Sequence, residues 1–126
     1  MCRVRRSDAD GNGVNIAIVG SRAYPRLDQV KRYVGMLPGI GVTVLSGGAQ
    51  GVDTAAQDEA DEQGIPTRIF LPEWGTLGRR AGVVRNAQLV DAADLLVAFW
   101  DGESRGTRNA IHHARNMVKP FVVVFP

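Results

Sequence analysis

The chain contains a single cysteine, Cys2, among its 126 residues. An internal disulfide is therefore impossible, and no metal site built from several cysteines can form. No stretch approaches the ~20 consecutive apolar residues that a membrane span needs, and the N-terminus lacks the apolar centre of a signal peptide. These absences predict a cytoplasmic protein with no membrane partner.

Lysine is nearly absent as well. Lys31 and Lys119 are the only lysines among 15 basic residues, and the formal net charge is +2. A charge this small does not demand a nucleic-acid partner. The arginine bias either reflects the codon composition of the gene or serves phosphate binding, because a guanidinium can make planar bidentate contacts with phosphate that an ammonium group cannot.

Two common nucleotide-binding motifs and the usual catalytic sets are missing. No Gly-Lys-Ser/Thr segment is present, which excludes the P-loop of NTPases. The dinucleotide fingerprint needs Gly-x-Gly-x-x-Gly after the first strand, whereas here the Gly-rich segment follows the second expected strand, with Ser46 in the first Gly position. The adjacent His112 and His113 lack the i, i+4 spacing of a metal pair. No metal site and no catalytic triad are predicted.

What the sequence does contain is a regular alternation of short apolar runs and amphipathic segments. Five strands are expected at residues 16–19, 42–45, 67–71, 95–99 and 121–125. Apolar residues at helical spacing predict helices in each of the four intervals between the strands. This alternation is typical of an α/β fold, and we predict a Rossmann-like, doubly wound three-layer sandwich around a five-stranded parallel sheet.

The N-terminal residues differ from the rest of the chain. Residues 1–13 mix arginine, aspartate and glycine without apolar periodicity, so we expect a flexible tail there. Residues 14–126 contain no linker, repeat or low-complexity tract. One nucleotide-binding domain over residues 14–126 is therefore predicted.

The loop after the second strand is the first candidate site, because ligands of open parallel sheets bind beyond the carboxyl ends of the strands. Its glycines would let backbone N–H groups approach an oxygen, and the helix that follows adds partial positive charge. The predicted phosphate-binding residues of this loop are Ser46, Gly47, Gly48, Gln50, Gly51 and Asp53. Alternatively, the glycines only make a tight turn and allow close helix packing, and the aspartate is a first-turn acid favoured by the helix dipole.

The loops after the first and fourth strands repeat this pattern. They contribute the candidate ligand residues Gly20, Ser21, Arg22, Ser104, Arg105, Gly106 and Thr107. For the serine and threonine that precede the last helix, capping of that helix is the alternative interpretation. Asp101 and Glu103 are weak catalytic candidates in the same loop.

Four further residues are candidates from their position alone. Arg85 and Asn86 lie inside the third of the predicted helices, where arginine can clamp a phosphate together with Arg22 or can simply be solvated. Trp74 and Trp100 each follow a strand. Each ring can stack on a base or pack against its own loop.

Several motifs taken together resemble a known superfamily. They are Ile18-Val19-Gly20-Ser21-Arg22, Ser46-Gly47-Gly48-Ala49-Gln50-Gly51-Val52-Asp53, Gly82-Val83-Val84-Arg85-Asn86, Ala98-Phe99-Trp100-Asp101-Gly102 and Ser104-Arg105-Gly106-Thr107. In this order, from about Asn15 to the end, the chain resembles the YpsA-related branch of the SLOG superfamily. The resemblance implies the strand order 3-2-1-4-5, frequent homodimers and the binding of nucleotides or nucleotide-derived signals.

The same superfamily includes the LOG phosphoribohydrolases and DNA-processing protein A, which binds single-stranded DNA. The resemblance to LOG enzymes implies a phosphate loop at Gly102–Thr107 and a ligand contact at Arg85. LOG enzymes carry a catalytic glutamate three residues after the threonine, and Ala110 stands there in this chain. This departure favours binding over turnover.

Three functions follow from these observations. The leading one is a binding or sensing domain for a nucleotide or nucleotide derivative that needs no cofactor. The alternative is a LOG-like N-glycosidase acting on nucleoside 5'-monophosphates. The third is binding of single-stranded DNA, which is supported by the arginine-rich composition and the two tryptophans. A homodimer is expected from the resemblance.

Overall fold

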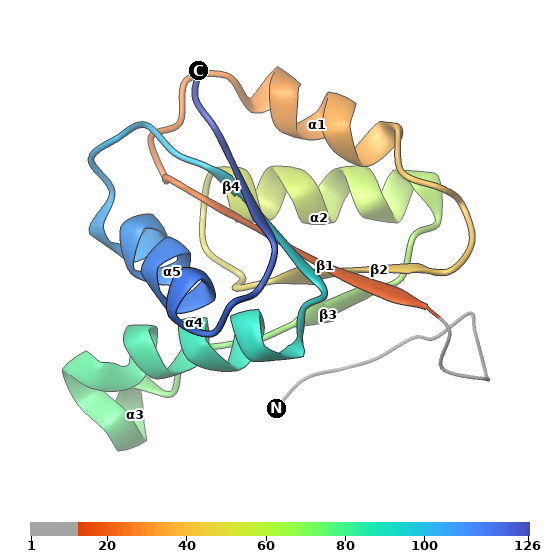
Figure 1. Ribbon diagram of the computed structural model, residues 1–126. Coiled ribbons are helices and arrows are strands. Elements are labelled where there is room, and N and C mark those ends of the chain that lie inside the picture. Colours follow the sequence, from red (N-terminus) through yellow and green to blue (C-terminus); the bar gives the residue numbers. More distant parts are fainter. Residues whose placement is uncertain (1–12) are drawn as a thin grey trace.

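The computed structural model describes residues 13–126, which form a parallel sheet between two layers of helices (Figure 1). The strands are β1 (Val14–Gly20), β2 (Val42–Ser46), β3 (Thr67–Ile69), β4 (Leu95–Phe99) and β5 (Phe121–Val124). Their order is β3-β2-β1-β4-β5, and every neighbouring pair is parallel. The predicted fold class and strand order are confirmed. The expected tail, apart from Gly13, lies outside the described residues.

The helices cover both faces of this sheet, as the continuous apolar strands require. They are α1 (Leu27–Gly35), α2 (Val52–Gln63), α3 (Trp74–Leu77), the 3-10 helix η1 (Gly78–Arg80), α4 (Ala81–Ala92) and α5 (Arg105–Asn116). Figure 1 shows α1 and α2 together on one face and α4 and α5 on the other. No helix within residues 13–126 is long and apolar enough to cross a membrane.

Side chains along each strand alternate between the two faces of the sheet, and this divides the core into two clusters. In β1, Ile16 and Ile18 point into the cluster beneath α1 and α2, whereas Ala17 and Val19 point into the cluster beneath α4 and α5. Successive strand side chains face opposite sides of a sheet. The central strand is therefore buried on both faces, which places its carboxyl end at Gly20 between the two helical layers.

Small side chains bring α2 close to the sheet. Ala55, Ala56 and Ala60 are buried on the face of α2 that meets the strands. At the start of the helix, a Cβ atom added to Gly20 would lie 2.5 Å from Val52 Cγ2. The loop that precedes α2 is thereby held directly over the carboxyl ends of β1 and β2.

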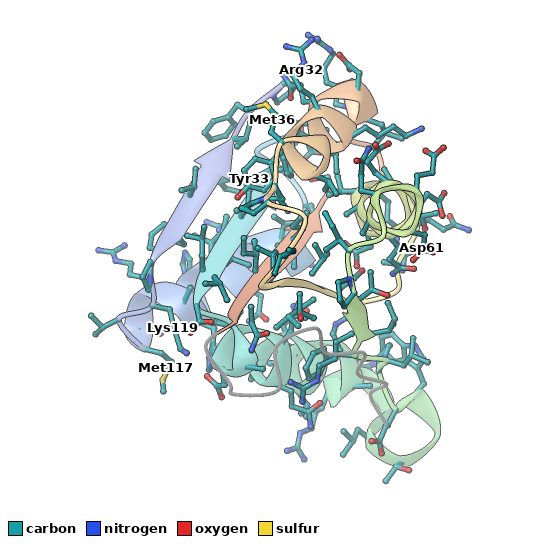
Figure 2. All side chains as sticks on the ribbon, turned by 90° about the vertical axis from the view of Figure 1, so that its right-hand side faces the viewer. Arg32, Tyr33, Met36, Asp61, Met117 and Lys119 are labelled. Carbon is teal, nitrogen blue, oxygen red and sulfur yellow. The ribbon has the colours of Figure 1, made fainter. Side chains whose placement is uncertain are left out.

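Helix α1 packs over this face with larger side chains. The ring of Tyr33 meets the ring of Phe99 edge to face, with centroids 6.2 Å apart. Figure 2 shows Tyr33 pointing towards the sheet, while Arg32 extends outward from α1 and Asp61 outward from α2. These two charged side chains thus face solvent, away from the sheet.

The third strand is shorter than expected. Its last ladder bond runs from the Phe70 N–H to the Ser46 carbonyl at 2.8 Å, and the chain then leaves the sheet at the exposed Leu71. Pro72 cannot donate a further ladder bond because proline has no N–H. The apolar pattern of residues 67–71 could not reveal this, since Leu71 is apolar without being buried.

Candidate nucleotide-binding cleft

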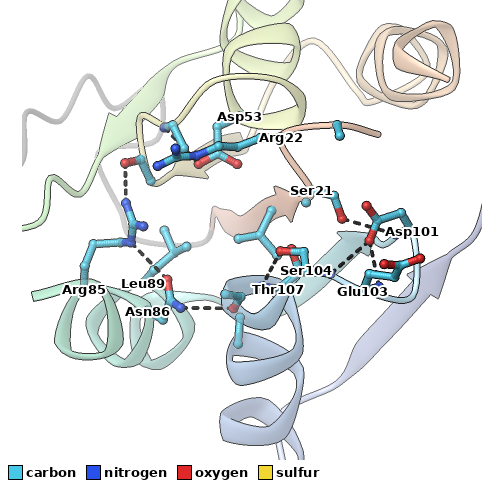
Figure 3. A pocket seen from close by; sticks show the side chains of 17 residues that line it. Ser21, Arg22, Asp53, Arg85, Asn86, Leu89, Asp101, Glu103, Ser104 and Thr107 are labelled. Atoms are coloured by element: carbon cyan, nitrogen blue, oxygen red, sulfur yellow. Dashed lines mark hydrogen bonds between the residues drawn. The ribbon is translucent and has the colours of Figure 1, made fainter. Parts of the chain in front are cut away.

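A cavity of about 520 Å³ opens at the carboxyl ends of β1 and β4 (Figure 3). Its volume is typical of pockets that bind small organic ligands. Twelve of the predicted site residues line it, namely Gly20, Ser21, Arg22, Gly47, Asp53, Arg85, Asn86, Asp101, Glu103, Ser104, Gly106 and Thr107. Residues from three loops, from α4 and α5 on one sheet face and from the start of α2 on the other therefore meet in one place, as the strand-end argument predicted.

Seven predicted residues do not line this cavity. They are Ser46, Gly48, Gln50, Gly51, Arg105, Trp74 and Trp100. The cavity also has an apolar part, formed by Val19, Leu89 and Ala110. Sequence reasoning did not identify Leu89. Leu89 follows Arg85 by four positions on α4, and this spacing places both side chains on the same helix face.

Ser21 links the end of β1 to the loop after β4. Its side chain is buried, and its hydroxyl accepts a hydrogen bond from the Asp101 N–H at 3.2 Å. Asp101 in turn accepts the N–H groups of Glu103 at 2.8 Å and Ser104 at 3.0 Å. These backbone hydrogen bonds hold the pKa of Asp101 below its usual value. Asp101 therefore orders this loop as an ionised group.

Ser104 caps α5. Its hydroxyl accepts the Thr107 N–H at 3.3 Å and lies 3.1 Å from the Thr107 hydroxyl. The capping interpretation is therefore confirmed for Ser104, whereas Thr107 lies within the first turn of α5 and donates the capped N–H. Both remain on the cavity wall, where the first turn of a helix offers backbone N–H groups and partial positive charge to an anion.

The loop between β2 and α2 is held by side chains of α2. The Ser46 hydroxyl accepts the Gly48 N–H at 3.3 Å and the Gln57 side-chain amide at 2.7 Å. Asp53 accepts the Ala49 N–H at 3.2 Å. Burial raises the pKa of Asp53 to about 6, against the opposing effects of backbone hydrogen bonds from Ala49 and Gly47 and of the nearby Arg85 and Arg22 charges.

Arg85 is anchored to the protein rather than solvated. Its guanidinium donates to the Gly47 carbonyl, and its Nε donates to Asn86 Oδ1 at 3.0 Å. Asn86 Nδ2 then donates to the Gly106 carbonyl at 3.2 Å and to Asn109 Oδ1 at 3.1 Å. This chain of hydrogen bonds joins the β2–α2 loop to the start of α5 across the cavity. The partial burial of Arg85 is the main cause that lowers its pKa.

Glycine is needed in the β2–α2 loop for close approach. A Cβ on Gly47 would lie 2.6 Å from Arg85 Nη1. A Cβ on Gly51 would lie 2.5 Å from the Arg22 carbonyl oxygen, and Gly51 has φ +80°. The turn-and-packing interpretation therefore holds for Gly51, which seats the loop after β1 against the start of α2. Arg22 itself is exposed at the cavity mouth beside Asp53 (Figure 3).

The two tryptophans lie apart from the cavity. Trp100 Nε1 donates to the Ser104 carbonyl at 3.1 Å, and its ring lies 6.0 Å from that of Phe125. Trp100 therefore packs against its own loop. Trp74 begins α3 and is 57% exposed. Base stacking on Trp74 stays a prediction.

The position that carries glutamate in LOG enzymes lies on the cavity wall. Ala110 is buried there in the second turn of α5. A methyl group can neither donate nor accept a proton. Among residues 13–126, no group of three or more histidine, cysteine, aspartate or glutamate side chains could hold a metal ion. The arrangement suits noncovalent binding of an anionic ligand that also has an apolar part.

The chain is similar to known proteins in both sequence and fold. The sequence profile of a family described as DNA recombination-mediator protein A matches residues 8–75, just over half of the chain. No curated protein sequence matches significantly.

Two solved structures share the fold. DNA processing protein A from Streptococcus pneumoniae has a TM-score of 0.76 and 18% identity, covering 88% of this chain and 50% of that one. DNA processing protein A from Helicobacter pylori, solved to describe its single-stranded DNA binding mode, has a TM-score of 0.63 and 21% identity, covering 97% of this chain and 69% of that one. The chain thus spans about half the length of the first of these proteins.

Proposed function

The chain belongs to the DNA recombination-mediator protein A family, and from this premise we propose that it binds single-stranded DNA. One nucleotide of the strand would occupy the cavity at the carboxyl ends of β1 and β4. The DNA binding described for the Helicobacter pylori protein supports this proposal, although the likeness to that structure is one of fold.

The observation that carries the proposal is the convergence of Arg22, Arg85 and the first turn of α5 on one cavity. A phosphate placed there would meet a guanidinium at the mouth and the N-terminus of a helix at the wall. The apolar surface of Leu89 and Ala110 is suited to a sugar or a base. A cavity of about 520 Å³ accommodates a ligand of this size.

Arginines outside the cavity could contact the neighbouring phosphates of a strand. Arg79 and Arg80 precede α4, and Arg105 and Arg108 lie in the first turn of α5. All four are exposed. Because α4 and α5 both begin at the carboxyl edge of the sheet (Figure 1), these four residues belong to segments at the same end of the domain as the cavity.

Binding of a free nucleotide or nucleotide derivative is the second candidate. It is favoured by the cavity itself, which is large enough for one nucleotide and combines polar with apolar walls. Glycosidic cleavage is less favoured, because Ala110 puts a methyl group where the LOG mechanism needs a carboxylate. We expect no release of free base from nucleoside monophosphates.

Fluorescence anisotropy of a labelled oligothymidylate tests the proposal. We expect binding that weakens with salt, with a slope of about −0.7 in log K against log[salt] for each phosphate contacted. Arg22→Ala should weaken binding, whereas Arg32→Ala, on the exposed face of α1, should not. If adding the protein left the anisotropy of the oligonucleotide unchanged at every salt concentration, DNA binding would be refuted. A rise in melting temperature on addition of free nucleotides would then favour the second candidate.

The resemblance also predicts a homodimer. Light scattering of the purified protein measures its mass in solution. A mass that corresponds to a single chain at all concentrations would contradict the prediction.

A further inference from the structure

The carboxylate of Asp53 is buried in the wall of the proposed DNA site. Its side chain is 4% exposed and lines the cavity. Arg22, from the loop after β1, and Arg85, from α4, both lie near enough to act on its charge. An acid at this point is unexpected in a site for an anion, and the binding of DNA alone does not explain it.

The carboxylate also takes up donors that a phosphate could have used. The Ala49 N–H points at Asp53 Oδ2, and the Gly47 backbone contributes a further hydrogen bond to this group. The Gly47 carbonyl is bound by Arg85. The Gly-rich loop therefore presents the protein's own anion to the cavity instead of a set of open amides.

The charges around the cavity do not favour a ligand with several negative charges. Its ionisable lining consists of two arginines and three acids, Arg22, Arg85, Asp53, Asp101 and Glu103. When all five are charged, the acids exceed the arginines by one. A phosphodiester carries one negative charge, whereas a terminal phosphate monoester carries about 1.5 to 2 at pH 7. Each additional ligand charge meets this excess of acid.

Among the three acids, Asp53 has the strongest effect on a bound phosphate. Asp101 is tied to the N–H groups of Glu103 and Ser104, and Glu103 is exposed to solvent. Water and salt screen an exposed charge far more than a buried one. The Asp53 charge is buried and lies next to the two arginines that would hold the phosphate.

We propose that Asp53 is a specificity-determining residue that makes the site accept an internal phosphodiester and disfavour a terminal phosphate monoester or polyphosphate. This inference rests on the proposed DNA binding and specifies its substrate class. The site would bind within a strand rather than at a phosphorylated end. Free nucleoside monophosphates and diphosphates would then compete poorly with DNA.

Competition against the labelled oligothymidylate at pH 7.5 tests this. The two competitors are thymidine 5'-monophosphate and its methyl ester, which differ by one methyl group and by the charge of the phosphate. For the wild type we expect the methyl ester to compete about tenfold better than the monophosphate. This is the size of the repulsion expected between the extra negative charge of the monophosphate and a weakly screened carboxylate. Asp53→Asn keeps an oxygen that can accept the Ala49 N–H, and it should reduce this preference to about twofold or less.

Asp58→Asn is the matched control, since Asp58 is exposed on the same helix and does not line the cavity. It should keep the wild-type preference. Equal competition by both compounds in the wild type, or no competition by the methyl ester at millimolar concentration, would overturn the inference even if Asp53→Asn failed to fold. The same preference in the wild type and in Asp53→Asn would also overturn it. Failure of the wild type to bind the oligonucleotide would instead refute the proposed function.

Discussion

Asp53 should make the stability of the domain depend on pH in an unusual direction. Its pKa is raised from 3.8 to about 6 in the fold, chiefly by burial. A difference of this size corresponds to about 3 kcal/mol of differential stability. Because the folded state holds the proton more tightly than the unfolded chain, this contribution favours folding at low pH. It is lost as the pH rises from about 4 to about 6.

The perturbation that isolates this contribution is Asp53→Asn, which cannot ionise. Unfolding in urea, followed by circular dichroism between pH 4 and pH 8, measures the free energy of unfolding of the variant and of the wild type. We expect the variant to gain about 2.4 kcal/mol relative to the wild type between pH 4 and pH 7, slightly less than the full shift because the unfolded carboxyl is already partly ionised at pH 4. Any constant offset that the amide introduces cancels in this comparison.

Asp101→Asn provides a control of opposite sign. Backbone hydrogen bonds lower the pKa of Asp101 in the fold, so its ionised form stabilises the domain above pH 4 and this stabilisation is lost at lower pH. This variant should therefore lose stability relative to the wild type as the pH rises towards about 4 from below, and its difference from the wild type should stay constant between pH 4 and pH 8. The reasoning on burial would be wrong if the difference in free energy of unfolding between Asp53→Asn and the wild type stayed constant within about 0.5 kcal/mol from pH 4 to pH 8. A change that small is less than a shift of one pKa unit produces.

Three other substitutions test the loops. Gly51→Ala should lower the free energy of unfolding by about 2 kcal/mol or more, measured in urea, because the new Cβ meets the Arg22 backbone and φ is positive. Ser104→Ala removes the side-chain cap of α5 and should cost about 1 kcal/mol in the same assay; no change would show that water replaces the cap. Arg85→Ala removes the bond to the Gly47 carbonyl and should cost about 1.5 to 3 kcal/mol and weaken binding of the labelled oligonucleotide; unchanged affinity would exclude Arg85 from the site.

The layers of the fold could be predicted from local patterns. Unbroken apolar strands such as β4 predict a sheet covered on both faces. The small residues Ala55, Ala56 and Ala60 predict a helix that lies close to that sheet. The resemblance to the SLOG superfamily supplied the strand order, and the family match agrees with that placement. The YpsA-related branch stays a prediction.

The partners of the site residues could not be predicted in the same way. The pattern of the β2–α2 loop is compatible with a phosphate cradle, but the partner of each loop amide depends on which side chains the fold brings within 3.5 Å. Asp53 and Gln57 reach back to this loop from the first two turns of α2. Arg85 reaches it from a helix 38 residues further along the chain.

The sequence by itself determined the periodicities, the two glycine-rich turns and the absence of a glutamate at Ala110, because these properties depend only on residue type and spacing. The tertiary structure decided that the loops after β1, β2 and β4 share one cavity, that both tryptophans lie outside it, and that a buried carboxylate faces its two arginines. Burial and charge proximity are relations between segments far apart in the chain, and only folding creates them.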